Sequence, residues 1–163
     1  MVFFAIPVSV DAQQFYLWDL VDEKDYHRSA VGIAIETSNL AMQGTLGTGV
    51  IVRKFDETKE VKDITYYRAY VLTNFHVAAF DGGKDILRVE FRDGETSKGT
   101  LKQWDHKIDW AIIDTWIPEG YPVAEIVEEF PEIGEEVECV GLGSGVSIAS
   151  KFVRRFKCNI GKT

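Results

Sequence analysis

Short runs of alternating apolar and polar residues dominate the chain from residue 29 to residue 115. Val31, Ile33 and Ile35, for example, occupy every second position, and a period of two is typical of a strand that buries one face. Six runs of this kind predict strands at residues 31–35, 47–53, 66–73, 86–92, 96–104 and 108–115. Turn signals separate them and no helical period lies between them, so the pattern favours a closed antiparallel β-barrel over a parallel α/β sheet.

The segments between and after these strands are more polar or richer in glycine and proline. The charged run at residues 55–63 predicts an exposed hairpin tip, because so many charged side chains cannot be buried together. Residues 75–80 predict one helical turn, and residues 116–122, with two prolines and a glycine, predict a linker. Two further strands are expected at residues 135–142 and 146–157, joined by a glycine-rich turn.

The N-terminal segment has two competing interpretations. Residues 2–10 are a mostly apolar run of the length of a signal-peptide core, although no positive region precedes them. Alternatively, Asp11 caps a short helix that buries Phe15, Trp18 and Val21. We favour export, and therefore a periplasmic or extracellular location over a cytoplasmic one. No run of 18 apolar residues is present, so a transmembrane helix is not expected.

Composition narrows the class of protein. A chain of 163 residues with 45% hydrophobic and 27% charged residues suits one globular domain plus a remainder. The net charge of −8 argues against nucleic acid as a partner, since phosphate binding requires concentrated lysine and arginine. The one basic cluster, at residues 151–157, is interpreted as the solvated face of a strand.

Two residues are candidates for chemistry. His76 follows an apolar strand and its Thr73-Asn74 break, and a histidine can take and return a proton near neutral pH if its tautomer is fixed. Asp109 stands at the head of an otherwise apolar run. Because an unpaired carboxylate there is costly, a partner is expected for it.

These segments together resemble the trypsin/chymotrypsin-like serine peptidases, and in particular their bacterial HtrA-like branch. GTGVIV at residues 47–52 is similar to the family's Gly-x-Gly strand, VLTNFHV at 71–77 to its histidine motif, and DWAIID at 109–114 to its aspartate motif. Their order and spacing also agree. The resemblance implies that His76 is the general base, that Asp109 orients it, and that the barrel is trypsin-like.

The third member of the family's triad is missing. The family's nucleophile lies in a Gly-x-Ser-Gly-Gly loop, and no serine of this sequence stands in that pattern; Ser144 lies in a glycine turn instead. We therefore expect a six-strand barrel at residues 29–117 that carries His76 and Asp109. An N-terminal segment at 1–28 precedes it, and residues 118–163 form a linker and the first strands of a second, incomplete barrel.

Other kinds of site are weakly supported. His106 with Asp105 and Asp109 lacks a third or fourth ligand at fixed spacing, so no metal site is expected. No cofactor is implied, and the C-terminal Gly-Lys-Thr lacks the leading glycine of a phosphate-binding loop. Cys139 and Cys158 form either a single disulfide or two free core thiols, and we favour free thiols.

The sequence thus predicts part of a serine endopeptidase that acts on polypeptides and is inactive by itself without a nucleophile. Two alternatives stay open. The chain is either a non-catalytic protease-like module that binds a peptide or subunit, or one half of an enzyme that a partner chain or a missing C-terminal segment completes.

Overall fold

The computed structural model describes residues 28–36, 45–79, 86–141 and 154–159. Eight strands and one short helix lie in these ranges: β1 (Ala30–Glu36), β2 (Thr45–Val61), β3 (Ile64–Thr73), α2 (Phe75–Ala78), β4 (Ile86–Glu90), β5 (Thr96–Asp105), β6 (Trp110–Pro118), β7 (Glu136–Gly141) and β8 (Arg154–Asn159). The fold is therefore all-β, as predicted. Within the described ranges, no helix is long and apolar enough to cross a membrane.

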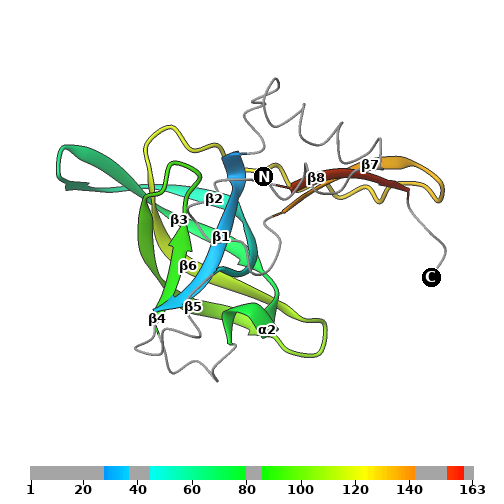
Figure 1. The fold of residues 1–163 in the computed structure, drawn as a ribbon, viewed down its shortest axis with the longest axis horizontal. Helices are drawn as coiled ribbons and strands as arrows, with labels where there is room; N and C mark the ends of the chain where they lie inside the picture. The colour runs from blue at the N-terminus through cyan, green and yellow to red at the C-terminus, as the bar shows by residue number, and fades with distance from the viewer. Residues whose placement is uncertain (1–27, 37–44, 80–85, 142–153, 160–163) are drawn as a thin grey trace, which may run out of the picture.

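Six of the strands form a closed antiparallel barrel in the order β1-β2-β3-β6-β5-β4 (Figure 1). The barrel closes because β1 pairs with β2 along one edge and with β4 along the other. β6, which begins in the aspartate motif, lies between β3 and β5. The aspartate motif therefore runs beside the strand that leads into the histidine motif. The predicted six-strand barrel is confirmed.

The barrel interior is filled by the apolar residues of the alternating runs. Its fully buried side chains include Val31, Ile33, Ile35, Ile51, Val71, Val89, Ile113 and Ile117. Burying each such side chain contributes roughly 1.5–3 kcal/mol relative to leaving it in water. The alternation is clearest in β6, where every second residue is buried, and it fixes the register because a slip of one residue would turn the apolar set outward.

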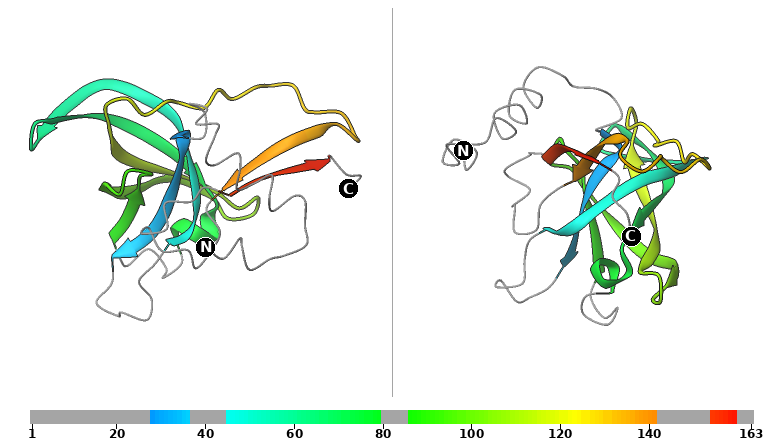
Figure 2. Two further views of the ribbon diagram at one scale, coloured as in Figure 1. Left: turned by 45° about the horizontal axis from the view of Figure 1, so that its top comes forward. Right: turned by 90° about the vertical axis from the view of Figure 1, so that its right-hand side faces the viewer.

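The second strand is longer than predicted. The sequence predicts a strand that ends at Arg53 and an exposed tip over residues 55–63, but β2 runs to Val61 and pairs with β3 up to the Val61–Ile64 contact. The charged residues are exposed as expected, and a two-residue turn at Lys62 and Asp63, both with positive φ, closes the hairpin. An extended hairpin with both faces in water shows no apolar alternation, which is why the pattern ended early. The β2–β3 hairpin projects beyond the barrel (Figures 1 and 2).

The predicted linker at residues 116–122 is wrong for its first three residues. Trp116, Ile117 and Pro118 belong to β6, and Ile117 is fully buried. Pro118 is tolerated because it is the last residue of the strand, where one missing N–H costs little. The connection that follows, residues 119–135, has no strand or helix.

Beyond the barrel, β7 and β8 form a two-stranded antiparallel sheet. Strands were expected at 135–142 and 146–157; β7 (Glu136–Gly141) matches the first closely, whereas β8 (Arg154–Asn159) overlaps only the end of the second and runs to Asn159. Residues 142–153, including Ser144, lie outside the described residues, as do residues 1–27 with the predicted signal or helix. The side chains of Cys139 and Cys158 are also outside the described part. A second barrel is not shown by these strands.

Candidate active site

His76 is presented by the helical turn that follows β3. Asn74 keeps an extended backbone (φ −76°, ψ 145°), and its carbonyl accepts the N–H groups of Val77 and Ala78 at 3.2 and 3.1 Å, which starts α2. Val77 and Ala78 are buried and anchor the turn on the barrel. His76 points the other way, and its side chain is 70% exposed.

The Gly-x-Gly motif of β2 packs against the helical turn α2. A Cβ added at Gly47 would lie 2.8 Å from the Cγ2 of Val77, closer than atoms pack, so glycine is required for the turn to sit on β2. The hydroxyl of Thr73 donates to the carbonyl of Thr48 at 2.8 Å. The two sequence motifs are therefore parts of one contact that holds the end of β3.

Asp109 lies in the turn between β5 and β6, and its backbone is left-handed with φ 55°. This conformation is uncommon for a residue with a Cβ, although aspartate tolerates it better than most. The turn is fixed from the histidine side, because the Asn74 side-chain amide donates to the carbonyl of Asp109 at 3.1 Å and to its Oδ2 at 3.2 Å. The backbone N–H of His76 donates to Oδ1 at 3.0 Å.

The two predicted site residues meet directly. The Nδ1 of His76 lies 2.7 Å from the Oδ2 of Asp109. A carboxylate can only accept a hydrogen bond, so this contact places the imidazole proton on Nδ1 and leaves the Nε2 lone pair available. The structure thus brings His76 and Asp109 together, although 33 positions separate them.

Electrostatics favour an ionised Asp109. Its pKa is lowered, first by the hydrogen bond from the backbone N–H of His76 and then by the His76 side chain and the Asn74 amide, while partial desolvation opposes the shift. A carboxylate that is charged at neutral pH can hold the imidazole in one orientation and stabilise its protonated form.

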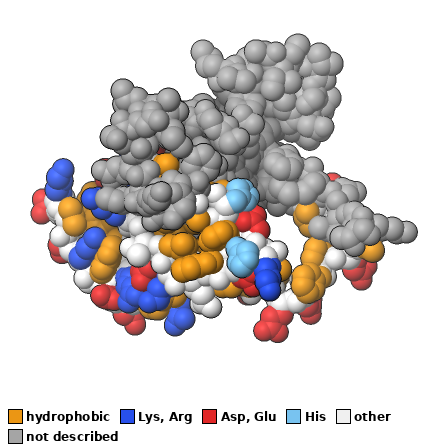
Figure 3. All heavy atoms as spheres, turned by 90° about the horizontal axis from the view of Figure 1, so that it is seen from below, with side chains coloured by type: hydrophobic (Ala, Val, Ile, Leu, Met, Phe, Trp, Pro, Cys, Tyr) orange, Lys and Arg blue, Asp and Glu red, His pale blue; other side chains and the backbone are white. Residues whose placement is uncertain are grey.

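Aromatic side chains flank the pair. Phe75 stacks on Trp104 with ring centroids 6.4 Å apart and lies 6.4 Å from the ring of His106. Trp104 is 50% exposed and Ile108 is 72% exposed. Figure 3 shows histidine side chains on this face of the molecule with hydrophobic side chains beside them. The pair therefore stands on an open, partly apolar surface.

The residues weighed as a metal site do not form one. Asp105 accepts the N–H of Lys107 at 2.8 Å, which is a turn contact, and His106 packs near Phe75. Among the described residues, no group of three or more histidine, cysteine, aspartate or glutamate side chains could hold a metal ion.

Sequence reasoning missed the part played by Asn74. It was expected only as a residue that tolerates a turn, but its amide joins the two halves of the site. The contact spans 35 residues, and nothing in the local pattern around Asn74 points to it. Only its position two residues before His76 could have suggested a supporting role.

A closed six-strand barrel with a histidine–aspartate pair at the ends of β3 and β5 has the architecture of the chymotrypsin-like proteins. No protein-family model matches the sequence, and no curated protein matches it. Among solved structures, it is similar to the crystal structure of the serine endoprotease from Yersinia pestis, with a TM-score of 0.59 and 22% sequence identity. The match covers 85% of this chain and 42% of that chain. The chain therefore has a trypsin-like protease fold and spans less than half the length of that protein.

Proposed function

We propose that this chain is part of a serine endopeptidase of the trypsin-like, HtrA-like kind, in which His76 is the general base and Asp109 orients it. One observation carries the proposal. The 2.7 Å contact between His76 Nδ1 and Asp109 Oδ2 leaves Nε2 directed away from the carboxylate, on a side chain that is 70% exposed. A buried structural histidine would instead have both ring nitrogens satisfied inside the fold.

The proposed reaction is acyl transfer to a serine. The serine Oγ attacks the scissile carbonyl carbon while His76 Nε2 takes the hydroxyl proton, and the negative charge of Asp109 stabilises the resulting imidazolium. His76 then gives that proton to the leaving amine, so the peptide C–N bond breaks and an acyl-enzyme remains. Water, deprotonated by the same Nε2, releases the acid and regenerates the serine.

In the proposed peptidase the nucleophile lies outside this sequence, since none of its serines stands in a Gly-x-Ser-Gly-Gly loop. In the proposed arrangement, residues 29–117 are the first barrel and residues 118–163 lead into a second barrel that carries the nucleophile. The substrate is a polypeptide. We further propose that residues 1–28 hold the remnant of an export signal and that the protein works in the periplasm or outside the cell.

The connection after β6 favours completion by further polypeptide. Its Ile126, Val127, Phe130 and Ile133 side chains are between 66% and 94% exposed. Four large apolar side chains within eight residues are unusual on a finished surface and mark a site of contact. That contact is supplied either by more of the same chain or by a partner chain. A non-catalytic binding module is the remaining alternative.

The test uses the protein that carries this sequence as its own cells make it. A fluorophosphonate probe, which labels only an activated serine, should label the wild-type protein, and the same protein should cleave an unfolded polypeptide. His76→Ala should abolish labelling. Asp109→Asn should lower kcat by on the order of 10⁴, because an amide does not fix the productive tautomer.

A matched control is Asp105→Asn, which changes a carboxylate four residues away whose hydrogen bond among the described residues is to the N–H of Lys107 in its own turn. It should label and cleave as the wild type does. Absence of labelling in the wild-type protein would reject the peptidase and leave the non-catalytic module as the function.

A further inference from the structure

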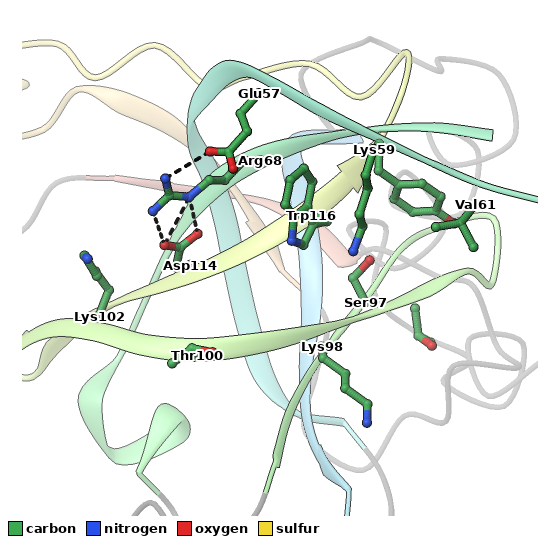
Figure 4. A pocket seen from close by; sticks show the side chains of 12 residues that line it. Glu57, Lys59, Val61, Arg68, Ser97, Lys98, Thr100, Lys102, Asp114 and Trp116 are labelled. Carbon is green, nitrogen blue, oxygen red and sulfur yellow. Dashed lines mark hydrogen bonds and ion pairs between the residues drawn. The ribbon is translucent and has the colours of Figure 1, made fainter.

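A groove crosses the outer face of the barrel, on the four neighbouring strands β2, β3, β6 and β5 (Figure 4). Its volume is about 650 Å³, within the range of ligand-binding clefts. It is not part of the site described above, since neither His76 nor Asp109 lines it. The side chains that matter for its chemistry are Glu57, Lys59, Arg68, Lys98, Lys102 and Asp114, with Trp116 between them.

The two acidic residues of the groove are already paired. The guanidinium of Arg68 donates to both carboxylate oxygens of Asp114, with Nη2 at 2.6 Å from Oδ2 and Nε at 3.0 Å from Oδ1. Its Nη1 donates to Glu57 at 3.2 Å. A bidentate pair of this kind holds its geometry, so these three residues form a fixed wall in which Arg68 offsets one of the two negative charges (Figure 4).

The remaining charges are three lysines. The ammonium of Lys59 lies over the ring of Trp116, 4.5 Å from its centroid. Lys98 and Lys102 are exposed on the outer face of β5, and neither contacts a carboxylate among the described residues. Four cationic and two anionic side chains thus line the groove of a chain whose net charge is −8. The groove is therefore locally positive, although the chain as a whole is negative.

The spacing of the lysines suits an extended ligand. Lys98 and Lys102 are four residues apart on one strand, which is at most about 13 Å at roughly 3.3 Å per residue, and the β5–β6 register shifts between Leu101 and Gln103 within that span. An extended peptide has the same rise, so acidic residues at positions i and i+4 of such a peptide can meet both lysines at once.

We propose that this groove binds an extended acidic segment of a partner polypeptide, with Lys98 and Lys102 pairing successive carboxylates and Lys59 a third. The exposed Val61 and the edge of Trp116 give the peptide backbone an apolar contact. The groove lies on the outer face of neighbouring hydrogen-bonded strands, so recognition rests on side chains.

Single-stranded nucleic acid fits the groove less well. Binding of unpaired bases relies on open aromatic faces, whereas Lys59 lies over the Trp116 ring.

The test measures binding of a fluorescent dodecapeptide of alternating glutamate and serine to the 163-residue protein by anisotropy. Binding should weaken as salt is raised, because exposed charge pairs are screened over about 8 Å at 0.15 M. The double variant Lys98→Glu, Lys102→Glu should raise Kd at least tenfold, and the milder Lys98→Gln, Lys102→Gln should fall between it and the wild type.

The matched control is Lys54→Glu, Lys62→Glu, which makes the same charge change at two exposed residues outside the groove and should alter Kd less than twofold. His76→Ala should bind as the wild type does, so the result is independent of the proposed peptidase. The proposal would be overturned by equal binding of a glutamine–serine peptide, by tighter binding of oligothymidylate, by an equal loss in the control variant, or by lysine-dependent self-association in place of peptide binding.

Discussion

At the scale of single residues, the site depends on hydrogen bonds that converge on Asp109. Its Oδ1 accepts the His76 backbone N–H, its Oδ2 accepts His76 Nδ1 and the Asn74 amide, and its carbonyl accepts a second Asn74 proton. The carboxylate therefore holds the backbone of α2 as well as the imidazole ring. Asn74, the residue at which the helical turn α2 begins, supplies the remaining hydrogen bonds to Asp109.

Acid should reduce the stability that the hydrogen bonds to Asp109 contribute. The pKa of Asp109 is lower in the folded protein than its ordinary value of roughly 3.9. Its stabilising contribution is therefore complete above that ordinary value and is lost as pH falls through the lower folded value. Asp109→Asn should reduce the free energy of unfolding at pH 7 and flatten its decline toward pH 2, as measured by urea unfolding.

The control for this experiment is Asp56→Asn, a change of the same kind at an exposed residue of β2. It should leave the slope of stability against pH as in the wild type. An unchanged slope in Asp109→Asn would contradict the assigned hydrogen bonds.

Asn74 gives a second prediction at this scale. Asn74→Ala removes the amide that bridges to Asp109 but leaves the backbone contact of His76 in place. It should lower peptidase kcat in the complete enzyme with little change in KM, because it loosens the orientation of the pair and touches no substrate. An effect on KM alone would contradict this positioning role.

At the scale of elements, the strands approach one another closely where glycines allow it. A Cβ at Gly49 would lie 2.5 Å from Val71 Cγ1 and 3.0 Å from Ile33 Cδ1. A Cβ at Gly99 would lie 2.5 Å from Ile113 Cγ2. The Gly-x-Gly motif is thus explained by packing against β3 and α2, and its link with the site is structural.

Gly49→Ala should destabilise the barrel by about 1–3 kcal/mol, the range for overpacking a dense core. Val71→Ala alone should cost roughly 1.6 kcal/mol for two buried methyl groups, but it also removes the clashing Cγ1. The double variant should therefore lose less stability than the sum of the single variants, by 0.5 kcal/mol or more. Additive effects in urea unfolding would show that the 2.5 Å approach is not what requires glycine.

The elements were predictable to different degrees, for physical reasons. Val31, Ile33 and Ile35 alternate because one face of β1 is buried, so the barrel strands follow from the sequence. The outer half of β2 has no buried face, so the full length of β2 could not be predicted from the sequence. The meeting of His76 with Asp109 was expected from the motifs, whereas the Asn74 bridge and the groove depend on strands that are adjacent only after folding.

At the scale of the whole molecule, the barrel is closed, and the large apolar side chains at residues 126–133 of the connection after it are exposed. Phe130 is 94% exposed, whereas Phe91 in the core is 2% exposed. The barrel should therefore be indifferent to substitutions at residues 126–133, and these residues should govern association with other polypeptide.

Phe130→Ser with Ile133→Ser should leave the free energy of unfolding within about 0.5 kcal/mol of the wild type, as is usual for surface changes, and should reduce self-association in sedimentation experiments. Phe91→Ser is the matched control and should cost at least 3 kcal/mol, as loss of a buried aromatic ring does. A large loss of stability in the Phe130 variant would mean that residues 130–133 also pack on the barrel.

The central claim is that Asp109 holds His76 with its proton on Nδ1 and its Nε2 lone pair free to act as a base. The most direct measurement is the tautomer of His76 by long-range ¹H–¹⁵N NMR, under conditions in which the ring carries a single proton. The account predicts the Nδ1–H form in the wild type and its loss in Asp109→Ala. An Nε2–H form in the wild type would contradict the account.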